Sequence, residues 1–263
     1  MNPLYVIKIG GNIIDDEQKL KAFLSNFALL KGRKILVHGG GKLATRMAGQ
    51  LGIQQQMIEG RRITDAETLR IVTMVYAGYI NKNIVACLQS HQCNAIGITG
   101  ADANLIPATK RQHATIDYGF VGDVTNLQPA VGTWQLLLDT GLTPVVAPIT
   151  HNGNGQLLNT NADTIAQEIA KGLSGMYEVQ LIYSFEKSGV LLDVEDEQSV
   201  IGTINPSYYA GLKEKGLIFA GMIPKLDNAF EALSHGVKKV IIGKAEQLDE
   251  LIGGRAGTTI ANE

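Results

Sequence analysis

The sequence has few of the features that mark secreted, membrane-spanning or nucleic-acid-binding proteins. Only two of its 263 residues are cysteines, Cys87 and Cys93, and their spacing fits neither a disulfide framework nor a CxxC motif. No apolar run approaches the roughly 18 residues that a membrane helix needs, and the first residues carry no basic leader. The 23 Lys and Arg residues are balanced by 25 Asp and Glu residues, so the net charge of −2 creates no field that would attract nucleic acid or an anionic membrane. We therefore expect a cytoplasmic protein with no nucleic-acid and no membrane partner.

Several common catalytic motifs are also missing. There is no GxSxG turn of the kind that carries a hydrolase serine. Gly41-Lys42 is followed by Leu43 rather than by Ser or Thr, so it is not a Walker loop. The histidines are not spaced as metal ligands, and the sequence therefore predicts no metal site held by the protein. They are His38, His91, His113, His151 and His235.

Short apolar runs alternate with segments of helical period along the whole chain. Most of the runs are apolar on both faces, as in a parallel sheet that is covered by helices. The predicted strands lie at residues 4–9, 34–37, 95–98, 143–147, 179–183 and 239–242. The motif Thr64-x-x-Glu67 resembles a capping box and predicts a helix over residues 64–89, and Asn161 can begin another helix. We therefore predict an α/β fold with a mostly parallel sheet between two layers of helices.

Two segments depart from this alternation. Residues 103–125 contain β-forming residues with little helical pattern, and we expect a small antiparallel excursion there. The apolar pattern lapses over residues 170–178, which we take as a soft boundary between two lobes.

Two predicted strands end in glycine clusters. Lys8-x-Gly10-Gly11 spans the end of the first, and His38-Gly39-Gly40-Gly41 follows the second. Consecutive glycines between a strand and a helix expose backbone N–H groups where the helix dipole is positive, and this arrangement suits phosphate or carboxylate. Tight turns with no ligand remain the alternative. Gly39, Gly41 and Ala44 also match G-x-G-x-x-A, but residues 51–59, which lead to Glu59, are typical of a loop or a short edge strand, which disfavours a dinucleotide site.

Three charged residues stand out beside these turns. Lys8 is one position from the end of an apolar strand, where an unpaired charge is costly to bury. Lys225 and Asp163 each lie at the start of a predicted helix. Each also has a structural explanation: Lys8 could extend to solvent, Asp163 could simply interact with a helix dipole, and Lys225 could be a solvated charge at a helix start. Arg62 could form a two-pronged contact with a carboxylate, or it could be exposed.

Taken in order, these motifs resemble the amino-acid kinase family, over about residues 4–260. The resemblance rests on Lys8-x-Gly10-Gly11, His38-Gly39-Gly40-Gly41, Gly60-x-Arg62-x-Thr64, Leu158-Asn159-x-Asn161-Ala162-Asp163 and Gly221-Met222-Ile223-x-Lys225. It implies a three-layer αβα sandwich with two lobes in one continuous domain. Residues 1–175 would bind an acylated amino acid, and residues 176–263 would bind ATP.

The resemblance also implies a role for each motif residue. Lys8 and Lys225 would be cations that stabilise the transition state, with Asp163 orienting both. Gly11 and Gly40 would donate their N–H groups to the transferred phosphoryl group. The acylated amino acid, which accepts the phosphoryl group, would be bound by Gly40, Gly41, Arg62 and Asn159. Residues assigned to ATP, with Mg²⁺ bound to its phosphates, are Gly10, Glu186, Lys187, Ser188, Gly189, Val190, Leu191, Leu217, Ile218 and Phe219. Phe185-Glu186-Lys187 departs from the Ser/Thr-Asp-Val that relatives commonly have there.

The implied activity is ATP-dependent phosphorylation of the γ-carboxylate of N-acetyl-L-glutamate, or of a related N-acylglutamate, in arginine biosynthesis. Kinases of the same family for aspartate, glutamate, carbamate or UMP are alternatives, and so is a non-catalytic nucleotide-binding regulatory protein. Only Met1, Asn2 and Pro3 precede the first predicted strand. Arginine-inhibited members have an extra helix there that links dimers into rings, so the resemblance implies a homodimer with weak or no inhibition by arginine.

Overall fold

An eight-stranded sheet forms the centre of the molecule. The computed structural model describes residues 1–58, 61–193, 195–218 and 222–262. The order across the sheet is β12-β14-β13-β11-β1-β2-β8-β5, and every neighbouring pair is parallel except β13 and β14. The strands are β1 (Pro3–Ile9), β2 (Arg33–His38), β5 (Ala95–Ile98), β8 (Thr143–Val146), β11 (Glu178–Phe185), β12 (Thr203–Ile204), β13 (Lys239–Lys244) and β14 (Thr258–Ile260). All six predicted strands are confirmed, whereas β12 and β14 were missed.

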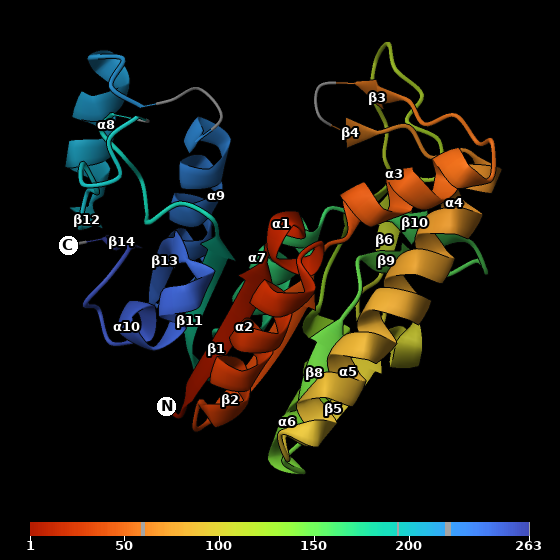
Figure 1. Ribbon diagram of the computed structural model, residues 1–263, viewed down its shortest axis with the longest axis horizontal. Helices are drawn as coiled ribbons and strands as arrows, with labels where there is room; N and C mark the ends of the chain where they lie inside the picture. The colour runs from red at the N-terminus through yellow and green to blue at the C-terminus, as the bar shows by residue number, and fades with distance from the viewer. Residues whose placement is uncertain (59–60, 194, 219–221, 263) are drawn as a thin grey trace.

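Helices cover both faces of this sheet, as predicted (Figure 1). They are α1 (Gly11–Ile14), α2 (Glu17–Leu29), α3 (Gly41–Gln50), α4 (Ala66–Thr73), α5 (Asn81–Ser90), α6 (Val131–Asp139), α7 (Ala162–Leu173), α8 (Pro206–Glu214), α9 (Ile223–Ser234) and α10 (Leu248–Ile252). The side chains of β1 alternate between the two layers. Leu4 and Val6 pack with α6, α7 and α9, whereas Ile7 and Ile9 pack with α2 and α10. Lys8 therefore lies on the α7 side of the central strand.

The two halves of the sheet come from successive parts of the chain. Strands β1, β2, β5 and β8 precede α7, and the strands from β11 onward lie on the other side of β1. The predicted boundary at residues 170–178 includes the connection from α7 (Ala162–Leu173) to β11 (Glu178–Phe185), and the division into two lobes there stays a prediction. In Figure 1, α8 and α9 lie at one end of the molecule and α3 and α4 lie at the other. Which ligand each half binds stays a prediction.

The longest helix differs from the prediction at its start and in its middle. It runs from α4 through a π-helical segment (Met74–Ile80) into α5. The N-cap is Asp65, whose carboxylate accepts the Thr68 N–H at 2.8 Å, so the predicted cap at Thr64 was wrong by one residue. Thr64 is fully buried, and its hydroxyl group instead donates to the carbonyl oxygen of Arg62.

This helix also qualifies the expectation that no segment could span a membrane. The helix Ala66–Ser90 is long and apolar enough to cross a membrane, judged by its length and composition alone. A core helix meets the same criterion, and the buried side chains of this one, among them Val72, Ile84 and Leu88, pack against the sheet.

Three small two-stranded sheets accompany the central one. The predicted antiparallel excursion is confirmed by β6 (Ala108–Lys110) pairing with β7 (Gly122–Val124). Sequence analysis missed the antiparallel pairs formed by β3 (Met57–Ile58) with β4 (Arg61–Arg62) and by β9 (Ile149–His151) with β10 (Leu157–Asn159). Since β4 and β10 carry Arg62 and Asn159, these pairs position two of the predicted site residues.

Candidate active site

The two glycine turns lie side by side at the carboxyl ends of the central strands. β1 and β2 are parallel neighbours with Ile9 opposite His38, and each strand is followed by glycines and the start of a helix, α1 or α3. The Gly10 N–H donates to the carbonyl oxygen of Ser184 in β11 at 3.0 Å. Gly40 has a φ of +149°, and a Cβ there would collide with the Ile80 side chain. Only glycine fits this turn.

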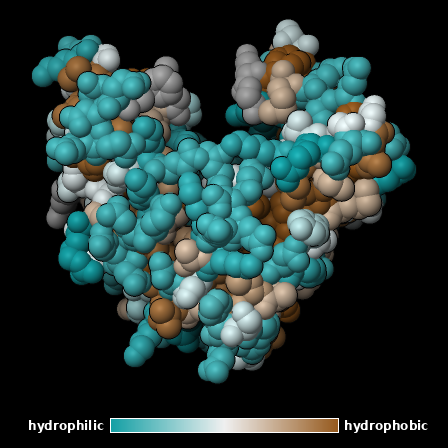
Figure 2. Space-filling model, viewed as in Figure 1, coloured by the Kyte–Doolittle hydropathy of each residue, from teal (hydrophilic) through white to brown (hydrophobic). Residues whose placement is uncertain are grey.

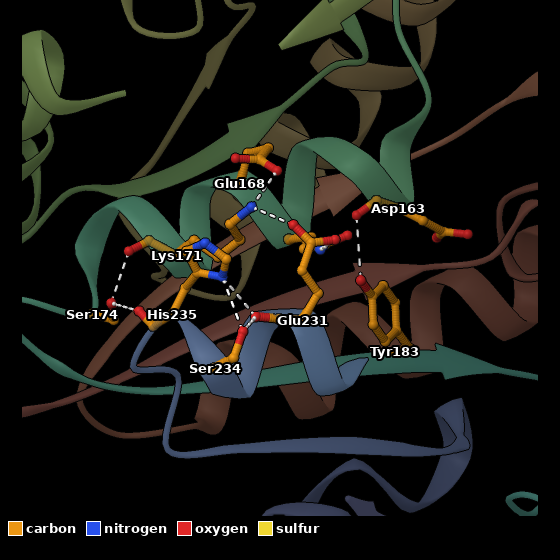
Figure 3. Close-up of polar contacts among 9 residues, drawn as sticks. Asp163, Glu168, Lys171, Ser174, Tyr183, Glu231, Ser234 and His235 are labelled. Carbon is orange, nitrogen blue, oxygen red and sulfur yellow. Dashed lines mark hydrogen bonds and ion pairs between the residues drawn. The ribbon is translucent and has the colours of Figure 1, made fainter. Parts of the chain in front are cut away.

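Lys8 and Asp163 form an ion pair between the central strand and α7. Lys8 Nζ lies 2.7 Å from Asp163 Oδ1, and the two side chains are 17% and 29% exposed. Asp163 is in the first turn of α7, where the Asn161 side chain accepts its N–H at 2.7 Å, as the predicted helix start requires. Tyr183 Oη donates to the Asp163 carbonyl oxygen at 3.4 Å (Figure 3). The backbone of Asp163 is therefore held both by the N-cap of α7 and by β11.

Lys225 approaches the same pair from α9. Its ammonium lies 4.5 Å from the centre of the Phe185 ring, and among the residues that the structure describes it forms no ion pair. Burial lowers the pKa of Lys225, Asp163 opposes this effect, and Lys8 lowers the pKa further. The structure thus brings together all three charged residues that the sequence singled out.

Two cavities meet at these residues. The smaller, of about 340 Å³, is lined by Lys8, Gly10, Gly11, Lys42, Glu186 and Lys187 among others. The larger, of about 690 Å³, is lined by residues that include Gly40, Gly41, Arg62, Arg111 and Asn159. Asp163 and Lys225 line both. Figure 2 shows the molecule hollowed between its two ends.

The residues predicted to bind the acylated amino acid are held in place by hydrogen bonds. Arg62 Nη2 donates to the Gly41 carbonyl oxygen and to Thr45 Oγ1, both at 2.9 Å. Asn159 Nδ2 donates to Thr64 Oγ1 at 3.0 Å. The guanidinium and amide are therefore fixed at the wall of the larger cavity, where they could bind a carboxylate.

Arg111 also lines the larger cavity, and sequence analysis missed it. Its Nε donates to Asp123 Oδ1 at 3.0 Å, and its guanidinium lies 5.8 Å from the centre of the Tyr118 ring. The only signal for it was an arginine within the predicted antiparallel excursion.

Some of the residues predicted to bind ATP line the smaller cavity, and others are buried or exposed elsewhere. Glu186 and Lys187 line the smaller cavity. Ser188 Oγ donates to Glu197 at 3.0 Å, and Gly189 lies against Thr258. Val190, Leu191 and Ile218 are buried, and Leu217 is exposed. Phe219 lies outside the described residues, and the assignment of these residues to ATP stays a prediction.

A polar network that sequence analysis missed joins α7 to α9 (Figure 3). Lys171 Nζ lies 2.9 Å from Glu168 Oε1 and 2.8 Å from Glu231 Oε1. Gln167 donates to the other Glu231 oxygen at 3.1 Å. Because α7 carries Asp163 and α9 carries Lys225, this network fixes the helices that deliver two of the three charged residues.

Comparison with known proteins identifies the family. A sequence model of the Amino acid kinase family matches residues 3–244. The chain belongs to this family. It is 61% identical over 253 residues to the acetylglutamate kinase of Cytophaga hutchinsonii, which covers 96% of this chain and 95% of that protein. It is 52% identical over 255 residues to the acetylglutamate kinase of Parabacteroides distasonis, which covers 97% and 99%.

Solved structures share the amino-acid kinase fold. N-acetylglutamate synthase from Neisseria gonorrhoeae, complexed with coenzyme A and N-acetyl-glutamate, matches with a TM-score of 0.82 and 21% identity over all of this chain, which spans 60% of the synthase chain. Carbamate kinase from Giardia lamblia bound to AMP-PNP matches with a TM-score of 0.70 and 16% identity, covering 100% of this chain and 99% of that one. At these identities the likeness shows the fold alone, and it confirms the predicted fold class.

A fully buried histidine, His38, contacts the glycine turn at the site of this amino-acid kinase. Burial lowers the pKa of His38 from 6.5 to about 4. The unfolded chain therefore binds a proton near pH 6.5 that the folded protein binds only near pH 4. The stabilisation from neutral His38 is complete above pH 6.5 and is lost as the pH falls through this window.

Between about pH 7.5 and about pH 5, the free energy of unfolding should fall more for the natural protein than for His38→Asn. We expect the two decreases to differ by about 2 kcal/mol. Urea unfolding of both proteins at the two pH values measures this difference. An equal pH dependence would show that His38 is not held neutral by burial.

Proposed function

We propose that this chain transfers the γ-phosphoryl group of ATP to the γ-carboxylate of N-acetyl-L-glutamate, forming an acyl phosphate and ADP in arginine biosynthesis. The observation that carries the proposal is the Lys8–Asp163 ion pair, with Lys225 beside it, at the junction of the two cavities. Two acetylglutamate kinases, which match this chain at 52–61% identity over nearly their full length, support it. A protein that only binds nucleotide needs no such group of charges.

The two substrates would occupy the two cavities. We place the acylated glutamate in the larger cavity, against Gly40, Gly41, Arg62 and Asn159, with Arg62 on its α-carboxylate. This assigns the acceptor to residues 1–175. ATP would lie on the side of residues 176–263, with its phosphates reaching the smaller cavity, whose lining includes Lys8, Gly10, Gly11 and Lys187.

The proposed chemistry needs no catalytic base. A γ-carboxylate with an ordinary pKa of about 4.3 is ionised at neutral pH and can attack the phosphorus atom directly. The enzyme must overcome repulsion between this anion and the triphosphate and stabilise the charge on the transferred oxygens. Lys8, Lys225 and the N–H groups of Gly11 and Gly40 would supply that stabilisation. Asp163 would keep the two ammonium groups from repelling each other out of position.

We also propose that Mg²⁺ enters bound to the ATP phosphates, where it would neutralise part of their charge. The wall of the smaller cavity suits phosphate oxygens, because lysines and the Gly10–Gly11 turn line it. The Asp163 carboxylate is engaged by Lys8. Among the described residues, no group of three or more His, Cys, Asp or Glu side chains could hold a metal ion.

The direct test is ADP production with a panel of acceptors and hydroxylamine trapping of the acyl phosphate. N-Acetyl-L-glutamate and N-succinyl-L-glutamate are compared with L-glutamate, L-aspartate, carbamate and UMP. We expect acceptor-dependent ADP and a trapped hydroxamate only with an acylated glutamate, as the similarity to acetylglutamate kinases suggests. Binding of an amino-acid carboxylate by Arg62 and Asn159 would by itself disfavour only carbamate and UMP. Turnover of another acceptor with neither acylated glutamate active would contradict the assignment.

We further propose a cytoplasmic homodimer in which the helix from α4 to α5 contributes to a two-fold interface. Cys87 and Cys93 are free thiols, which suits a reducing compartment. The outer side of the long helix exposes Met74 (53%) and Tyr79 (65%) within its π-helical segment. Large apolar side chains exposed close together are typical of an interface.

Light scattering should give the mass of two chains, unchanged by arginine, and Met74→Glu with Tyr79→Glu should shift the mass toward one chain. Leu136→Glu is the matched control, because Leu136 is equally exposed (63%) on α6, and its mass should equal that of the natural protein. A hexamer that arginine inhibits strongly would contradict the proposal.

A further inference from the structure

His38, the last residue of β2, contacts the glycine turn that follows it. Its ring is fully buried, and Nδ1 lies 2.8 Å from the carbonyl oxygen of Gly39. The other ring nitrogen, Nε2, lies 3.1 Å from Nδ2 of Asn81, the first residue of α5. Both ring nitrogens are therefore engaged, one by the turn and one by the long helix.

The neighbouring groups fix the direction of these hydrogen bonds. A carbonyl oxygen can only accept, so the ring proton of neutral His38 lies on Nδ1 and Nε2 is an acceptor. Asn81 Nδ2 also lies 2.9 Å from the carbonyl oxygen of Val145, so this atom must be the amide nitrogen, which donates to both partners. Asn81 Oδ1 accepts from Lys82 Nζ at 3.2 Å. The hydrogen bonds thus run in one direction, from Lys82 through Asn81 and His38 to Gly39.

The long helix supports the same turn through packing. Ile80 and Tyr76, in the π-helical segment, occupy the space where a Gly40 side chain would lie. The next residue, Asn81, is almost fully buried, and a Cβ at Gly97 would collide with its Oδ1 atom. A single stretch of helix therefore supplies both the surface under Gly40 and the amide that holds His38. Such π-helical segments are frequent at functional sites.

The consequence for the site follows from peptide geometry. The C=O of Gly39 and the N–H of Gly40 belong to one planar trans peptide and point in opposite directions. Holding the Gly39 oxygen toward buried His38 therefore directs the Gly40 N–H away from the core, on the side of the larger cavity that Gly40 lines. We propose that His38 and Asn81 are positioning residues, which fix the Gly39–Gly40 peptide so that its N–H is aimed at the acceptor or the transferred phosphoryl group. This role rests on the proposed function.

The test compares substitutions that keep or remove the donor to Gly39. His38→Asn keeps an N–H donor near the position of Nδ1, His38→Gln moves its amide beyond the Gly39 oxygen, and His38→Leu has no donor. We expect the substitutions His38→Leu and His38→Gln to lower kcat/KM for the acylated glutamate by about 10- to 100-fold, the range for one lost hydrogen bond at a buried group. The KM for ATP should change by less than about threefold, and Asn should recover most of the loss. Leu36→Val, in the same face of β2, is the control for lost packing.

A measurement on the natural protein keeps the proposal testable if the Leu variant does not fold. Nitrogen-15 NMR should show the His38 proton on Nδ1 at neutral pH, both in the natural protein and in Asn81→Leu, because the Gly39 carbonyl oxygen can only accept. A proton on Nε2 would overturn the proposal, and so would a folded His38→Leu or His38→Gln protein with the kcat/KM of the natural enzyme.

Failure of the proposed function would look different. The natural protein would then phosphorylate no acylated glutamate, while its His38 would still carry the proton on Nδ1.

Discussion

The site depends on one ion pair, between Lys8 in the central strand and Asp163 at the start of α7. Lys8 follows apolar residues in β1, and a lysine there would be costly without a partner. The carboxylate 2.7 Å away compensates this charge and fixes where α7 begins relative to the sheet. Because α7 is joined to α9 through Lys171 and Glu231, the position of Lys225 depends on the same pair. Pairing leaves the ammonium group at a cavity wall, where an anion can reach it.

The two glycine turns, at the carboxyl ends of β1 and β2, are held by different backbone groups. Gly10 is anchored through its N–H to β11, and the Gly39–Gly40 peptide is anchored through its oxygen to His38. Both anchors are buried, so the peptide groups next to them are directed by the core rather than by the ligand. Preorganised N–H groups of this kind need little rearrangement as charge develops, which makes them effective in phosphoryl transfer.

Local sequence patterns predicted the central strands, the start of α7 and the charged residues that meet in the site. They worked because each depends on neighbours in sequence: buried parallel strands have continuous apolar runs, and Asn161 caps its own helix. The start of α4 was misplaced because the Thr64 hydroxyl donates to the Arg62 carbonyl oxygen and accepts from Asn159, and a capping motif does not record this distant partner. The short strand β14 has too few residues for a periodic signal. The contact of His38 with Asn81, and that of Lys171 with Glu231, join residues 43 and 60 positions apart and left no sequence pattern.

A double-mutant cycle on kcat with Lys8→Met and Asp163→Asn tests most directly whether Lys8 and Asp163 act as one unit. Each single substitution should lower kcat by about 10²- to 10³-fold, the scale for losing one preorganised contact in the transition state. The double variant should be no more than about tenfold slower than the slower single variant, since either change already removes the pair. If the two effects instead multiply, or if either folded single variant keeps the kcat of the natural enzyme, the ion pair is not the unit on which catalysis depends.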